Sequence, residues 1–179
     1  MPQTTPNITR DGKDWVLHMT QWLPLPPDQL FVFFGDAHNL EAITPDTVGF
    51  KILTPPPIDM HAGTRIDYKL RVRGLPIRWT THIEVWDPPR RFVDNQIKGP
   101  YKRWHHTHTF EPKDGGTLCI DTVRYRPPGG PLAPLINWLA VERDVVKIFE
   151  HRTTVLEKRF GRAADNHETP GNVQLTPGG

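Results

Sequence analysis

The chain of 179 residues has a single cysteine, Cys119, and no excess of charge of either sign. One thiol cannot form an intramolecular disulfide and lacks the partner cysteines of a structural zinc site. Cys119 is therefore predicted to be a small buried apolar residue. The 22 basic and 20 acidic residues give a net charge of +2, whereas nucleic-acid binding requires a concentrated basic face. The composition predicts no nucleic-acid partner.

Long apolar runs are missing as well. No stretch approaches the roughly 20 apolar residues of a membrane-spanning helix. The opening residues, MPQTTP, lack the basic and apolar regions of a signal peptide. Phosphate-binding loops, nucleophile elbows and paired zinc motifs are not found either. We therefore expect a cytoplasmic protein with no membrane span.

Proline, in contrast, is abundant, and its 20 copies occur largely in clusters that separate one element from the next. Between these clusters, apolar and polar side chains alternate, as is typical of half-buried antiparallel strands. Strands are predicted over residues 14–23, 48–53, 64–73, 77–86, 91–97, 102–111 and 117–126. The last two are joined across Lys113–Gly116, a strong hairpin signal.

Helical patterns occur in two places. Residues 28–34 and 37–43 are predicted as two short helices after the first strand, with Pro27 at the first helical position and Asp36 as the N-cap of the second helix. From residue 134 to 160, apolar residues that include Leu135 and Leu139 recur at the helical period, and Gly161 ends the pattern.

These elements predict one α+β domain over residues 13–161. It follows a flexible lead-in, residues 1–12, and precedes a disordered tail, residues 162–179. Consecutive strands with tight turns form an antiparallel sheet, and its apolar face must be covered. Only the C-terminal helix is long enough to cover it. We therefore predict a helix-grip fold, in which a curved sheet of about seven strands wraps around that helix.

The order of these motifs resembles the START-like superfamily, also called SRPBCC, and especially its bacterial ligand-binding and polyketide cyclase/dehydrase-like branch. The similarity covers residues 12–161. It rests on the segments WLPLPPDQLFVFFGDAHNLEAITP, GTRIDYKLRVRGLPIRWTTHIEVWDPPRRFVD, GPYKRWHHTHTF with GGTLCIDTVRYRPPGG, and IFEHRTTVLEKRF. The resemblance implies an internal cavity for a hydrophobic small molecule. It implies no particular reaction, because the superfamily contains both carriers and enzymes.

Alternation also predicts which side chains line this cavity. Aromatic and aliphatic walls are typical of ligand pockets. From the central strands and the last hairpin we expect the ligand-contacting residues Tyr68, Leu70, Trp79, Thr81, Ile83, Trp104, Phe110, Val123 and Tyr125.

The last hairpin adds a polar group to this apolar wall. A turn at Lys113–Gly116 places His108 opposite Asp121, although a slip of one residue would separate them. His106, His108 and Asp121 are the candidate catalytic residues, because a carboxylate that orients a neutral imidazole can make it a general base or a donor to a ligand carbonyl. The alternative is that they are satisfied polar residues on a partly exposed sheet, or a structural His–Asp pair. From the final helix, Arg143 or Arg152 could also reach the cavity mouth.

A metal ion is a further possibility, since two histidines two residues apart on a strand can reach one ion, with Asp121 as a third ligand. Such pairs are common by chance, and a true site also needs groups that hold its ligands in place. We therefore predict no metal and no cofactor.

Three functions fit this sequence. The first is binding of a hydrophobic or amphipathic small molecule, such as a lipid, a quinone or a polyketide-like compound, by a monomer or homodimer. The second is an enzyme of the cyclase or dehydratase type that uses a cavity histidine as general acid or base. The third is a protein-interaction module whose cavity is filled by side chains. The sequence favours the first function.

Overall fold

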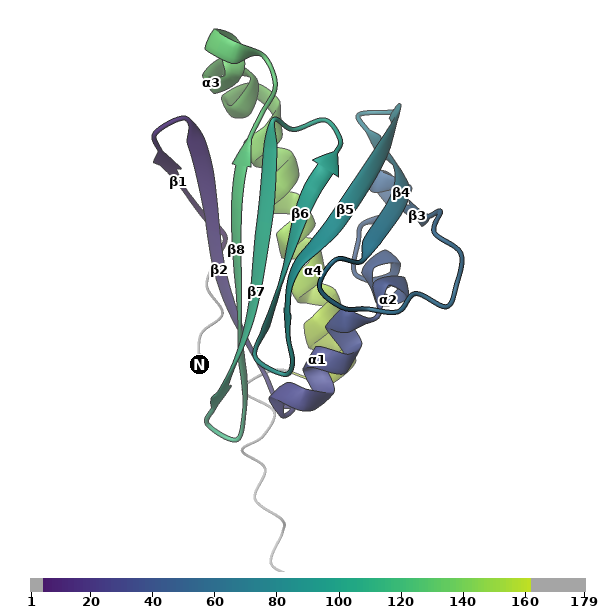
Figure 1. The fold of residues 1–179 in the computed structure, drawn as a ribbon. Helices are drawn as coiled ribbons and strands as arrows, with labels where there is room; N and C mark the ends of the chain where they lie inside the picture. Colours follow the sequence, from purple (N-terminus) through teal and green to yellow (C-terminus); the bar gives the residue numbers. More distant parts are fainter. Residues whose placement is uncertain (1–4, 162–179) are drawn as a thin grey trace, which may run out of the picture.

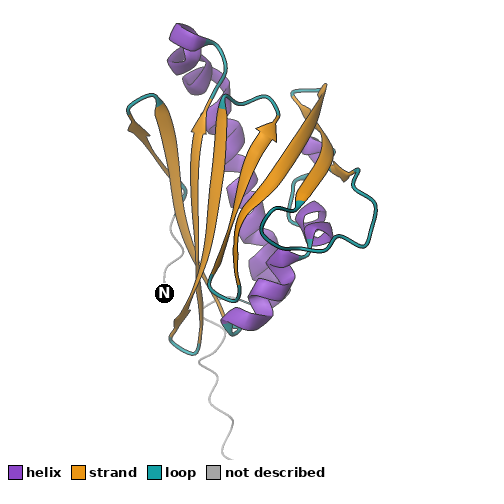
Figure 2. Ribbon diagram, in the orientation of Figure 1, coloured by secondary structure: helices purple, strands orange, loops and turns teal. Residues whose placement is uncertain are grey.

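Eight antiparallel strands form one open sheet, and the C-terminal helix lies against one of its faces (Figures 1 and 2). The computed structural model describes residues 5–161. The strands are β1 (Asn7–Asp11), β2 (Asp14–Leu23), β3 (Lys51–Ile52), β4 (Arg65–Val72), β5 (Leu75–Asp87), β6 (Arg91–Lys98), β7 (Arg103–Lys113) and β8 (Gly116–Arg126). The helices are α1 (Pro27–Gly35), α2 (Ala37–Ala42), α3 (Ala133–Ile136) and α4 (Glu142–Phe160). Short turns of helix occupy η1 (Asp46–Val48), η2 (Gly130–Leu132) and η3 (Asn137–Val141).

The sheet order is β1-β2-β8-β7-β6-β5-β4-β3. The last strand, β8, therefore pairs with the first long strand, β2, while α1 and α2 carry the chain from β2 to the opposite edge at β3 (Figure 1). This arrangement confirms the predicted helix-grip fold.

The predicted strand number is one too low, because Asn7–Asp11 forms β1 and pairs with β2 along its whole length. These residues belong to the segment predicted as a flexible lead-in, and for them that prediction is wrong. An edge strand that is almost fully exposed carries no alternation of apolar and polar residues, so its sequence gave no strand signal. The predicted disordered tail lies outside the described residues.

Two hairpin turns set the register of the sheet. Asp114 and Gly115 both have positive φ angles, as do Arg73 and Gly74, which is the backbone of the two-residue turn that matches strand twist. The β7–β8 turn pairs His108 with Asp121, so the predicted register is confirmed. The predicted N-terminal residues of the two short helices are confirmed as well. Pro27 is the first residue of α1, and the Asp36 carboxylate accepts a hydrogen bond from the backbone N–H of His38 at 2.9 Å.

The C-terminal helix differs from its prediction in one respect. Residues Asn137–Val141 form a π-helical turn between α3 and α4, and a π turn fits extra residues into the helix and rotates the face that follows. As a result Leu135 and Leu139 are 50% and 55% exposed. The prediction that these two leucines lie on the buried face of the helix is therefore wrong. Phe149 of α4, which belongs to the same predicted apolar face, is buried.

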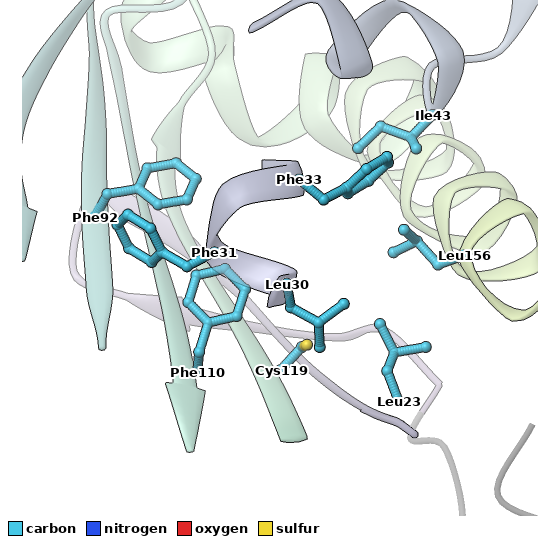
Figure 3. Close-up of a cluster of buried hydrophobic side chains, with 9 residues drawn as sticks. All are labelled: Leu23, Leu30, Phe31, Phe33, Ile43, Phe92, Phe110, Cys119 and Leu156. Carbon is cyan, nitrogen blue, oxygen red and sulfur yellow. The ribbon is translucent and has the colours of Figure 1, made fainter. Parts of the chain in front are cut away.

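Two hydrophobic clusters attach the helices to the sheet. The first cluster packs α3 and α4 against β2 and β8 and consists of Trp15, Leu17, Met19, Val123, Tyr125, Ala133, Val145 and Phe149. Around α1, a second cluster closes one end of the sheet and consists of Leu23, Leu30, Phe31, Phe33, Ile43, Phe92, Phe110, Cys119 and Leu156 (Figure 3). Cys119 is buried there, as predicted. Among residues 5–161, no helix is long and apolar enough to cross a membrane.

Two leucines of the C-terminal segment test the face change at the π turn. Leu156 is 2% exposed and Leu139 is 55% exposed. Leu156→Ala should lower the free energy of unfolding by about 2–5 kcal/mol, because it leaves a cavity in the core. Leu139→Ala should change it by less than about 0.5 kcal/mol. Chemical denaturation measures both, and equal losses would contradict the exposed position of Leu139.

Candidate functional site

A cavity of about 920 Å³ lies between the sheet, α2 and α4. Its walls come from strands β4 to β7, from the α1–α2 region, and from the inner side of the C-terminal helical segment. The described side chains leave this space open, whereas the interaction-module alternative required it to be filled. Of the residues predicted to contact a ligand, six line the cavity: Tyr68, Leu70, Trp79, Thr81, Ile83 and Trp104.

The other three predicted contacts lie elsewhere. Phe110 packs in the cluster around α1, while Val123 and Tyr125 pack under α4. Their faces were assigned correctly, since all three point to the helical side of the sheet and are buried. They are not part of the cavity wall because helices cover these positions directly.

One stretch of the wall carries a buried polar cluster, defined by Asp94 of β6, His106 and His108 of β7, Asp121 of β8 and Arg152 of α4. All but Asp121 line the cavity. The alternation of β7 places the two imidazoles on the inner face, with their ring centroids 3.7 Å apart. The cluster thus joins three adjacent strands to the helix that covers them.

Hydrogen bonds within the polar cluster connect each histidine to a different carboxylate. His106 Nε2 lies 2.8 Å from Asp121 Oδ1, and His108 Nε2 lies 3.0 Å from Asp94 Oδ2. His108 Nδ1 is also 3.0 Å from Asp121 Oδ1 but lacks hydrogen-bond geometry. The predicted cross-strand neighbour of Asp121 is therefore correct, but the hydrogen bond comes from the diagonal neighbour, His106.

Arg152 provides the positive charge of the polar cluster. Its Nη1 donates to Asp121 Oδ1 at 3.5 Å, and its guanidinium lies over the rings of Phe34 and Phe149, at 5.2 and 5.8 Å from their centroids. Its Nε is buried without a hydrogen-bond partner among the described residues. A buried donor of this kind is costly when unpaired, so it is available to an acceptor atom.

Burial and charge compete in setting the protonation of these groups. Burial favours the neutral acid, but the Arg152 guanidinium and the two imidazoles hold the pKa of Asp121 well below its usual range. Against the same effect of burial, the hydrogen bond with His108 keeps the pKa of Asp94 lowered. Burial, together with repulsion from His108, lowers the pKa of His106 to about 4. At neutral pH the polar cluster therefore holds two carboxylates and a neutral His106.

Asp94, His106 and His108 also offer ligand atoms within 4.8 Å of one another, which makes them the candidate metal ligands of the described residues. Both Nε2 atoms already face carboxylates, and the Arg152 cation stands 3.5 Å from Asp121. The arrangement suits a polar ligand atom better than a metal ion.

Asp94 is not among the site residues predicted from the sequence. A signal for it exists, because Phe92, Asp94 and Gln96 alternate in β6, and the large apolar Phe92 marks their face as the inner one. Phe92 also stacks on His108, with ring centroids 4.1 Å apart. The partnership of Asp94 with His108 needed the β6–β7 register, in which Phe92 pairs with His108.

A sheet gripping a helix around an apolar cavity defines the helix-grip class of proteins. The profile of the family described as polyketide cyclase / dehydrase and lipid transport matches residues 23–152. The chain belongs to this family, which confirms the resemblance to the START-like superfamily.

Solved structures share this fold. TTHA0849 from Thermus thermophilus is 21% identical, with a TM-score of 0.65 over 81% of this chain and 96% of that one. Ms6760 from Mycobacterium smegmatis is 17% identical, with a TM-score of 0.62 over 88% and 99% of the two chains. Ara h 8.0201 is 16% identical, with a TM-score of 0.58 over 81% and 99%. No curated protein matches the sequence. At these identities the structures establish the fold alone.

The lowered pKa of His106 predicts a loss of stability in acid. The ordinary pKa is 6.5 and the folded value is about 4, so at pH 5 the unfolded chain binds a proton that the folded chain does not. The contribution of His106 is complete above the unfolded pKa and is lost as the pH falls toward 4. Between pH 7 and pH 5 this lowers the free energy of unfolding by about 2 kcal/mol.

His106→Gln should therefore flatten the pH dependence of unfolding by about that amount, as measured by urea denaturation at pH 7 and pH 5. His105→Gln is the matched control. The His105 imidazole lies on the opposite face of the same strand, half-buried beside Glu84. This variant removes an imidazole but keeps His106. An unchanged slope in the His106 variant would contradict the assignment.

Proposed function

We propose that the chain binds a hydrophobic or amphipathic small molecule, with an apolar body along β4 and β5 and an oxygen atom at the polar cluster. One observation carries this proposal: an open apolar cavity of about 920 Å³ whose wall contains buried, partly unpaired polar groups. Pockets for small ligands have about 300–1,000 Å³ and few polar groups in apolar walls. Membership of a family described by cyclases, dehydrases and lipid transport supports the same function.

The chemistry of the walls limits the ligand. Tyr68, Trp79 and Trp104 offer aromatic faces to rings or acyl chains. At the polar cluster, the unpaired Nε–H of Arg152 can donate to a carbonyl or phenolic oxygen, while the Asp94 carboxylate can accept from a hydroxyl. Lipids with a polar end, quinones and polyketide-like aromatics combine these features.

Filling the cavity tests this proposal. Leu70 is a buried cavity-lining residue of β4, and Leu75, just beyond the next turn, is 68% exposed. Native mass spectrometry of the wild-type protein, purified from its host, should reveal a bound apolar molecule. Leu70→Trp should abolish that complex, because the indole occupies part of the space. Leu75→Trp, the matched control, should retain it.

Folding of both variants is checked by circular dichroism and thermal unfolding. A wild-type protein that carries no apolar molecule, and that fails to take up an apolar fluorescent probe, would contradict the proposal. So would a Leu70→Trp variant that retains its ligand fully.

A second candidate function is catalysis of the cyclase or dehydratase type. The observation that favours it is the neutral His106 beside Asp121, next to a His108 that Asp94 orients, in a cavity wall away from bulk water. An oriented imidazole can remove a proton next to a ligand carbonyl and return it to a departing hydroxyl, so that water leaves as the carbon–oxygen bond breaks.

Substitution of His108 separates binding from catalysis. If the ligand found by mass spectrometry is converted, with loss of one water, His108→Gln should slow this conversion by about 100-fold or more. Its affinity for the ligand should stay within about threefold, because most of the apolar contact area remains. Equal losses of affinity and turnover would indicate a binding role only. Thr107→Ala, on the opposite face of β7, is the control.

A further inference from the structure

Four large apolar side chains stand in solvent at the start of the C-terminal helical segment. Leu132, Leu135, Trp138 and Leu139 are 63%, 50%, 70% and 55% exposed. We call these four residues the apolar cap. Four such side chains within eight residues exceed the scattered apolar residues that are normal on a surface. The π turn lies between α3 and α4, so this segment and α4 turn different faces toward the sheet.

The apolar cap lies beside the cavity. Ile136, Ala140 and Val141 alternate with cap residues along the same helical segment and line the cavity. Figure 1 shows α3 projecting beyond the ends of the strands, at the same end of the sheet as the β4–β5 and β6–β7 turns. At the β4–β5 turn, Arg73 and Gly74 line the cavity, while the adjacent Leu75 is exposed. Exposed apolar groups therefore occur on both sides of this end of the cavity.

Positive charge surrounds the apolar cap. Arg143 and Lys147 follow it in the first turns of α4, and Lys102 lies in the β6–β7 turn; all three are exposed and make no ion pair within residues 5–161. Of the nearby acidic groups, Asp144 pairs with Arg73 at 3.0 Å, whereas Glu142 accepts a hydrogen bond from the neutral amide of Asn137 at 3.0 Å and keeps its charge. Three unpaired cations against one carboxylate leave a net positive charge around the cap.

We propose that the apolar cap docks on the surface of an anionic phospholipid bilayer, with Lys102, Arg143 and Lys147 facing the headgroups. Leucine and tryptophan on a protruding helical turn enter the boundary between headgroups and acyl chains, where tryptophan is favoured. Nearby cations add electrostatic attraction to an anionic surface. This docking proposal rests on the proposed function, because docking there brings the cavity next to the bilayer, which holds apolar ligands.

The charges favour a bilayer over a second copy of the chain as the occupant. In a two-fold dimer the same patch meets itself, so the cap of one chain would bring its unpaired Arg143 and Lys147 close to those of the other. Like charges brought together in this way are destabilising. A protruding turn also inserts into a fluid bilayer without a matching hollow on the partner.

Vesicle flotation with the full chain tests the proposal. The wild-type protein should float with vesicles of phosphatidylcholine mixed with phosphatidylglycerol, and less with phosphatidylcholine alone or at high salt, because salt screens the cations. The double variant Leu135→Ser, Trp138→Ser should lower the partition coefficient at least about tenfold by removing apolar area. Arg143→Glu with Lys147→Glu should lower binding to the anionic vesicles and remove most of its salt dependence.

Val32→Ser is the matched control, since Val32 is 75% exposed on α1, away from the cap; it should bind vesicles like the wild type. Absence of flotation, or equal loss in the Val32 variant, would overturn the proposal. So would a wild-type dimer, measured by light scattering, that the cap variant converts to a monomer.

The bound ligand separates the two proposals. Native mass spectrometry of the double cap variant should show the same apolar molecule as the wild type, because the four cap side chains do not line the cavity. Lost flotation in this variant with retained ligand supports docking. A wild-type protein that binds ligand but not vesicles overturns docking and leaves the cavity function intact.

Discussion

The packing of α4 against β2 and β8 is the constraint on which the rest of the molecule depends. Val145 and Phe149 press on Leu17 and Val123, and Gln21 of β2 donates to the carbonyl oxygen of Thr153 in α4 at 3.1 Å. The helix thus lies near one side of the sheet. Beyond the part of β6 and β7 that α1 covers, the apolar inner faces of strands β4 to β7 have no helix directly on them, and the cavity is the space that remains.

The polar cluster stands at the border between that packed side and the open one. Asp121 comes from the strand under the helix, Asp94 from a strand that faces the cavity, and the two histidines lie between them. Charges buried in this way are costly unless they are paired, and Arg152 is their counterion from the helix. The same pairing holds the imidazoles in fixed orientations, which a binding or reacting oxygen atom requires.

The fold also separates two kinds of apolar surface. Inside the molecule, aromatic rings line a cavity that suits a hydrophobic ligand. Outside, Leu135 and Leu139, beside and within the π turn, point away from the core and toward solvent. Ile136 and Val141 of the same segment face the cavity. A single helical segment therefore contributes to the proposed ligand site and to the proposed bilayer surface, which places the two functions beside each other.

Local sequence patterns determined strands β2 and β4 to β8, the inner faces of β4, β5 and β7, the caps at Pro27 and Asp36, and the pairing of His108 with Asp121. Each depends on side-chain alternation or turn geometry within a few residues. The same patterns missed β1 and overextended β3, which is only Lys51–Ile52, since Asp46–Val48 is a helical turn. The tertiary structure decided which inner faces lie under helices, so that Phe110, Val123 and Tyr125 became core while Trp79 and Trp104 line the cavity. It also decided the contacts of Asp94 and Arg152. These depend on strand order and on the lateral position of α4, which arise from packing between segments far apart in the chain and leave no local signal.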